Sequence, residues 1–98
     1  MEKRIRYINL YDYYSELLTE KQQNYFEEYY FNNLSLQEIS ELYNVSRNAA
    51  FKAIKDVEFK LEDFESKMNL YEKDEKLKSI INEIEDRELK ERLNDILW

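Results

Sequence analysis

The chain contains neither glycine nor proline among its 98 residues. Glycine is the usual residue in left-handed turns and phosphate-binding loops, and proline kinks or ends helices. Two-residue hairpins and glycine-rich nucleotide loops are therefore not expected. We predict an all-α fold in which asparagine takes the left-handed backbone positions, because it tolerates that conformation best among the non-glycine residues. Asn33, Asn44 and Asn69 stand next to predicted helix ends.

Residues 36–54 have the spacing of a helix-turn-helix, two short helices that cross over a tight turn. Two apolar stripes recur at helical spacing: Leu36, Ile39 and Leu42 in the first helix, and Val45, Ala50 and Ile54 in the second. Ser40 and Ala50 are small enough to let the helices approach closely. Asn44 falls where the turn needs positive φ.

Capping signals place the helix starts. Ser35 with Glu38 and Thr19 with Gln22 match the capping-box pattern, and Ser46 is a suitable N-cap for the second motif helix. Helices are expected at about 4–18, from 19 to the Asn32-Asn33 pair, at 35–43 and at 46–68. The last carries a heptad-like apolar seam: Ala50, Ile54, Val57, Leu61, Phe64 and Met68.

Two regions are predicted from this pattern. Residues 1–68 form a helix-turn-helix head that includes the long helix 46–68, and residues 69–98 form a helical extension. The apolar faces of the extension can fold back on the seam or pair with a second copy of the chain. A homodimer through the C-terminal helices is thus one alternative, and an extension of the same domain is the other.

Composition excludes several classes of function. Cysteine and histidine are both absent, which removes disulfides, thiolate chemistry, imidazole bases and the usual zinc ligands. We expect no cofactor, no metal and no enzymatic activity. No stretch approaches the roughly 20 apolar residues of a membrane span, so a cytoplasmic protein without a membrane partner is expected.

Charge is distributed unevenly along the chain. Residues 1–45 hold 4 basic and 8 acidic side chains, residues 46–60 hold 4 and 2, and residues 61–98 hold 7 and 12. Only the middle segment is positive, at +2, in a chain of net charge −7. Because duplex binders usually present a broad basic face, this balance argues against a strong autonomous DNA binder.

Residues 17–65 resemble the YlxM family of small bacterial helix-turn-helix proteins. The resemblance rests on the TEKQ start at 19–22, the Tyr29-Tyr30 pair, LSLQEI at 34–39, YNVSR at 43–47 and KLEDFE at 60–65. The same head is similar to region 4 of bacterial sigma factors. Asn69 departs from the family, in which glycine is common. The resemblance implies a role in the signal recognition particle pathway, through contact with the particle's GTPase or its RNA.

The candidate nucleic-acid-binding residues lie on the second motif helix: Ser46, Arg47, Asn48, Phe51, Lys52 and Lys55. Arg47 is suited to guanine or phosphate and Asn48 to adenine. An equally favoured alternative is that these cations only form a solvent-exposed helix face. Phe51 is expected to pack under the N-terminal helix. Most tyrosines, at helical spacing, are expected in the core.

The basic residues near the N-terminus, Lys3, Arg4 and Arg6, suggest either a phosphate-contacting arm or, more often, a solvated helix end. Three functions remain open. The first is an accessory or regulatory protein of the signal recognition particle, the second a DNA-binding transcription regulator acting on duplex DNA, and the third an adaptor that binds only protein.

Overall fold

The structure, a computed structural model, describes residues 2–97 and is helical through most of them. Its elements are α1 (Glu2–Tyr14), a 3₁₀ turn (Ser15–Leu17), α2 (Glu20–Tyr30), α3 (Leu36–Tyr43), α4 (Arg47–Met68), α5 (Leu70–Asn82) and α6 (Arg87–Leu97). The all-α, helix-turn-helix prediction is confirmed. The chain divides into two compact units, unit 1 at Met1–Met68 and unit 2 at Asn69–Trp98.

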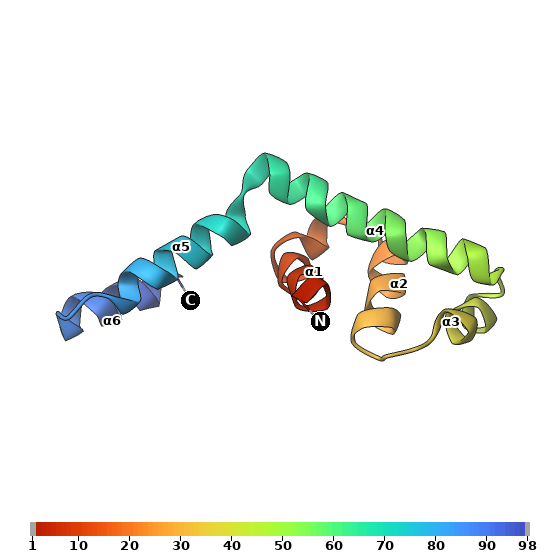
Figure 1. The fold of residues 1–98 in the computed structure, drawn as a ribbon, viewed down its shortest axis with the longest axis horizontal. Helices are drawn as coiled ribbons and strands as arrows, with labels where there is room; N and C mark the ends of the chain where they lie inside the picture. The colour runs from red at the N-terminus through yellow and green to blue at the C-terminus, as the bar shows by residue number, and fades with distance from the viewer. Residues whose placement is uncertain (1, 98) are drawn as a thin grey trace. The chain divides into compact units, whose positions relative to one another are not determined.

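Unit 1 is built around α4. Helices α1, α2 and α3 pack against this long helix, which Figure 1 shows passing over all three. The largest fully buried side chains come from all four helices: Leu10, Tyr14, Phe26, Ile39, Val57 and Leu61. Phe26 is stacked between Tyr11 and Tyr30, with ring centroids 4.2 and 4.3 Å apart. The tyrosines at helical spacing thus contribute mainly to the core, as predicted.

The predicted turn chemistry is confirmed. Both capping boxes form, Thr19 with Gln22 and Ser35 with Glu38. Three asparagines have left-handed backbone, Asn33 at φ 56°, Asn44 at φ 53° and Asn69 at φ 57°. Asparagine therefore fills the positions that glycine usually takes.

The first helix is shorter than predicted. It ends at Tyr14, and the 3₁₀ turn follows, where the expectation was a helix to about residue 18. Leu18 is extended at ψ 153° so that the capping box at Thr19 can begin α2, and the side-chain amide of Gln23 donates from Nε2 to the Ser15 carbonyl at 2.7 Å. Leu18 stays buried, whereas Leu17 is 53% exposed.

The apolar stripes of the helix-turn-helix were predicted with one error. Ile39, Ala50 and Ile54 are buried as expected, but Leu42 is 54% exposed. Its neighbour Tyr43 packs instead, with its ring centroid 4.7 Å from that of Tyr25. The Tyr43 ring thereby contacts α2 through Tyr25. In the seam of α4, burial extends to Leu61, and Met68 is exposed.

Two carboxylates lie in the core of unit 1. Glu58 and Glu65 are 7% and 6% exposed, on the same side of α4 as Val57 and Leu61. The Tyr30 hydroxyl donates to Glu58 and the Tyr14 hydroxyl to Glu65. Buried carboxylates need such donors, because an unpaired charge away from water is costly.

Unit 2 consists of α5 and α6, which pack against each other. Between residues 69 and 97, only Ile81 is a buried hydrophobic side chain. Several apolar side chains of both helices are exposed: Leu70, Leu77, Ile80, Leu89 and Ile96. Over the described residues 2–97, no helix has the length and apolar character that crossing a membrane requires.

Candidate nucleic-acid interface

The turn between α3 and α4 fixes where the candidate reading helix begins. Asn44 ends α3 with φ 53° and ψ 51°, and the Val45 amide donates to the Ser40 carbonyl at 2.9 Å. The Ser46 hydroxyl then accepts from the Ala49 amide at 3.0 Å, which caps α4. The helix therefore starts at Arg47 in a defined orientation.

The six predicted site residues lie together at the N-terminal end of α4, and all are exposed: Ser46, Arg47, Asn48, Phe51, Lys52 and Lys55. Ala50 and Ile54, on the opposite side of this segment, are buried in the core of unit 1. The end of α4 thus presents cations, an amide and an aromatic ring to solvent. Ser46 differs from the others because its hydroxyl oxygen serves as the helix cap.

Phe51 does not pack under α1, contrary to the prediction. Its side chain is 48% exposed, and the Lys55 amine lies 5.5 Å from its ring centroid. Ala50 and Ile54 form the buried face of α4 in this segment. Phe51 lies outside that face. The result is an exposed aromatic next to Lys52 and Lys55, the combination that stacks on unpaired bases.

Two of the three basic residues near the N-terminus, Arg4 and Arg6, belong neither to a free arm nor to a solvated helix end, whereas Lys3 is exposed. Arg4 donates to the carbonyls of Tyr29 and Tyr30, at 3.3 and 2.7 Å, and to the Asn33 side chain at 2.7 Å. Its guanidinium carbon is also 5.0 Å from the centroid of the Tyr30 ring. Arg6 pairs with Glu62 at 2.7 Å. Arg4 therefore caps the end of α2, and Arg6 ties α1 to α4.

Near Lys55, a hollow of about 260 Å³ opens where α1, α2 and α4 meet. Its wall combines three cations, three tyrosines and one carboxylate: Lys3, Arg4, Lys55, Tyr7, Tyr29, Tyr30 and Glu58. Lys55 pairs with Glu58 at 3.2 Å. Lys3 thus lines the same hollow as Lys55, which sequence reasoning did not anticipate because the two residues come from distant helices.

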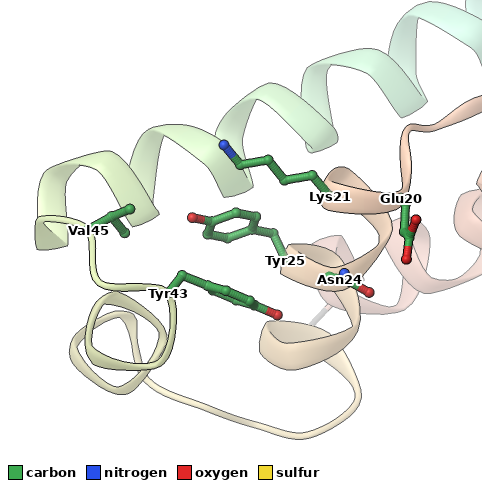
Figure 2. Close-up of a pocket in the computed structure, with 6 residues that line it drawn as sticks. All are labelled: Glu20, Lys21, Asn24, Tyr25, Tyr43 and Val45. Carbon is green, nitrogen blue, oxygen red and sulfur yellow. The ribbon is translucent and has the colours of Figure 1, made fainter.

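A second hollow, of about 410 Å³, lies between α2 and the turn after α3 (Figure 2). Its lining is Glu20, Lys21, Asn24, Tyr25, Tyr43 and Val45. None of these residues was a predicted site residue, and the tyrosine spacing, which also fits core packing, was the only signal in the sequence.

Several tyrosines of unit 1 have raised pKa values. Burial, followed by the hydrogen bond to Glu58, raises the pKa of Tyr30. Burial, followed by the hydrogen bond to Glu27, raises that of Tyr11. Burial also raises the pKa of Tyr7 and of Tyr43, to which the neighbouring carboxylates Glu58 and Glu28 add. These phenols are therefore neutral at physiological pH.

The chemistry available at the end of α4 is that of binding. Guanidinium and ammonium groups bind phosphates, the Asn48 amide can donate and accept at a base edge, and Phe51 can stack. In the part of the chain that the structure describes, no cluster of three or more acidic side chains could hold a metal ion.

The fold and this exposed helix end define the class: a small all-α helix-turn-helix protein. The chain belongs to the UPF0122 family of YlxM/p13-like helix-turn-helix proteins, because the sequence model of that family matches residues 1–96. UPF0122 proteins of Geobacillus sp. and Oceanobacillus iheyensis are 43% and 45% identical to it, over 88% and 86% of this chain and 78% and 80% of their own. One from Clostridium novyi is 46% identical, over 97% of this chain and 86% of its own.

Proposed function

We propose that this protein is a non-enzymatic accessory factor of the signal recognition particle, acting in the cytoplasm and binding nucleic acid through the N-terminal end of α4. The observation that carries the proposal is the exposure of Arg47, Asn48 and Lys52 on one helix end. The link to the particle rests on the YlxM resemblance, which implies contact with its RNA or its GTPase.

Binding through this end should be weak and salt-sensitive. The reading segment 46–60 has a net charge of +2, while the chain as a whole has −7. Only a few phosphate contacts are therefore available, and each released counterion contributes about 0.7 to 0.9 to the slope of log affinity against log salt. A structured RNA that brings a few phosphates and unpaired bases to α4 fits these residues.

Mobility shift with the particle's RNA and with duplex DNA, at two salt concentrations, tests the proposal. Arg47→Ala and Lys52→Ala should each weaken RNA binding and lower the salt slope by about one phosphate contact. Lys67→Ala is the matched control, because Lys67 is an exposed lysine near the far end of the same helix. Equal loss in all three variants, or in none, would remove the end of α4 as the reader.

A DNA-binding transcription regulator is the alternative that the same geometry favours. The end of α4 has the side chains that read base edges in a major groove, with Arg47 suited to guanine and Asn48 to adenine. Binding to one duplex sequence that exceeds binding to the RNA would establish this alternative. Retention of the particle's GTPase after nuclease treatment would instead favour the adaptor that binds only protein.

We also propose that unit 2 pairs with a second copy of the chain. Ile80, Leu89 and Ile96 are 58%, 44% and 84% exposed, and two helical hairpins can cover such faces by forming a four-helix bundle. Sedimentation equilibrium of the full chain should then show a dimer. Ile80→Glu combined with Leu89→Glu should yield a monomer, whereas Phe59→Glu in unit 1 should not.

A further inference from the structure

The hollow between α2 and the turn is lined by a phenol whose hydroxyl bonds to no other described residue. The Tyr25 residue as a whole is only 4% exposed, but its hydroxyl oxygen reaches the solvent of the hollow, because no fully buried side-chain oxygen or nitrogen among residues 2–97 lacks a partner. Figure 2 shows its ring projecting from α2 into the hollow, with the Tyr43 ring beneath it. A phenol in that position is available to a ligand, because it can both accept and donate a hydrogen bond.

The helices α2 and α3 beside this hollow carry a net negative charge. Residues 19–43, which form α2, α3 and their caps, contain five glutamates and one lysine. Glu20 lies in the lining itself and has no partner within residues 2–97. The Tyr43 hydroxyl donates to Glu28 at 3.5 Å, which places a further carboxylate next to the rings. The local field therefore favours a cation and disfavours phosphate.

The lining favours a flat cation with an apolar stem. The rings of Tyr25 and Tyr43, 4.7 Å apart and inclined at 39°, offer a π-face, and Val45 adds an apolar wall. An arginine guanidinium can stack on a tyrosine ring while it donates to the Tyr25 hydroxyl, the Asn24 carbonyl oxygen and Glu20. Lys21 is the one basic side chain in this lining, and its charge opposes that of the guanidinium.

We propose that this hollow binds an arginine side chain from a basic segment of a protein partner. The occupant is a protein and not a nucleic acid, because α2 and α3 would repel a polyanion while α4 attracts one. The molecule then has two binding surfaces of opposite charge preference, the acidic hollow for protein and the end of α4 for nucleic acid. The inference does not depend on the proposed function, since either surface can be lost alone.

NMR titration of the isotope-labelled full chain tests the inference. The probe is the peptide acetyl-Ala-Arg-Ala-Arg-Ala-amide, and the same peptide with citrulline in place of arginine is the uncharged control of equal shape. The side-chain amide of Asn24 and the methyls of Val45 should shift with the arginine peptide and hardly with the citrulline one. A lysine peptide should bind more weakly, because an ammonium lacks the planar fork.

Three single variants test the role of the Tyr25 hydroxyl and the sign of the charge preference. Tyr25→Phe, which keeps the ring, should weaken the arginine peptide about fivefold, as expected for one lost hydrogen bond. Glu20→Gln should weaken it too, and Lys21→Gln should strengthen it. Circular dichroism and thermal unfolding confirm that each variant folds.

Opposite signs would overturn the inference. If Lys21→Gln weakens the peptide or Glu20→Gln strengthens it, the hollow does not bind a cation. If Tyr25→Phe binds as well as the wild type, the hydroxyl plays no part. If a uridine hexanucleotide shifts Asn24 and Val45 at lower concentration than the arginine peptide does, the hollow binds a nucleobase.

Discussion

Units 1 and 2 are both built from amphipathic helices, yet they bury very different amounts of apolar surface. Of the thirteen buried hydrophobic residues among the described ones, twelve lie in unit 1 and one, Ile81, in unit 2. In unit 1 three helices converge on α4 and cover its apolar side along most of its length. In unit 2 one helix faces one other, so each covers only a narrow line of its neighbour. Amphipathicity therefore predicts a buried face only where enough neighbours exist to bury it.

The largest effect that this comparison predicts comes from matched truncations in the two units. Leu61→Ala removes a side chain that is 0% exposed, and it should lower the free energy of unfolding by about 2 to 5 kcal/mol. Ile80→Ala, at 58% exposure in unit 2, should change it by less than about 0.5 kcal/mol in a monomeric sample. Urea unfolding followed by circular dichroism measures both.

Phe59→Ala is the control within unit 1, because Phe59 is on α4 but 74% exposed. Its effect should resemble that of Ile80→Ala. Equal destabilisation by Leu61→Ala and Ile80→Ala at low protein concentration would contradict the comparison, since it would mean that unit 2 buries as much apolar surface per residue as unit 1.

The second effect concerns alkaline pH and is confined to unit 1. The folded state keeps Tyr30 protonated because burial and Glu58 raise its pKa, whereas the unfolded chain ionises it near pH 10. The stability that Tyr30 contributes is complete below pH 10 and is lost as the pH rises further. The loss from this one group is about 1.4 kcal/mol per pH unit.

Tyr30→Phe isolates this contribution. It removes the hydroxyl that donates to Glu58, so the variant should start less stable at pH 8 and then lose less stability between pH 10 and pH 11 than the wild type. Urea unfolding at each pH gives both slopes. Parallel slopes would show that Tyr30 ionises equally in the folded and unfolded chains.

Local signals predicted the caps and turns of unit 1, whereas its polar interior was not predictable. The capping boxes and the left-handed Asn44 depend on residues close in sequence, so their patterns were sufficient. Glu58 and Glu65 are buried because Tyr30 and Tyr14 reach them from 28 and 51 residues away. Nothing near either glutamate in sequence indicates that partner.

The candidate sites divide in the same way. The exposure of the N-terminal end of α4 could be predicted from the pattern of one helix and one turn. Only the position of Phe51 was wrong, because its exposure depends on where α1 packs. The hollow of Tyr25 and Tyr43 joins two helices through a ring contact. Tyrosines at helical spacing fit both a filled core and a lined hollow, so spacing alone could not distinguish them.

The third effect compares two left-handed asparagines. Asn44→Ala should cost about 1 kcal/mol, because alanine in left-handed backbone places its Cβ too close to a carbonyl oxygen. Asn69→Ala strains the backbone by a similar amount, but Asn69 stands at the boundary of unit 1. The unfolding of unit 1 should therefore hardly change in Asn69→Ala.

Urea unfolding compares the two variants with Asn44→Gly, which should be at least as stable as the wild type. A larger loss from Asn69→Ala than from Asn44→Ala would mean that the two units unfold as one.

The smallest effect lies at acid pH and again belongs to unit 1. The Ser35 amide, followed by the Ser35 hydroxyl, stabilises the Glu38 carboxylate and lowers its pKa below the usual 4.5. The stability from this interaction is complete above the unfolded pKa and is lost as the pH falls through the lower folded value. Glu38→Gln can keep the capping-box geometry without the charge, so its stability should vary less with pH between about 5 and 3. Because Glu38 is exposed, the difference should be small, and thermal unfolding at several pH values is the suitable measurement. If the wild type and Glu38→Gln lose stability in parallel over this range, the capping box of α3 holds the ionised and the protonated Glu38 equally well. The acid sensitivity of unit 1 would then originate in carboxylates other than Glu38.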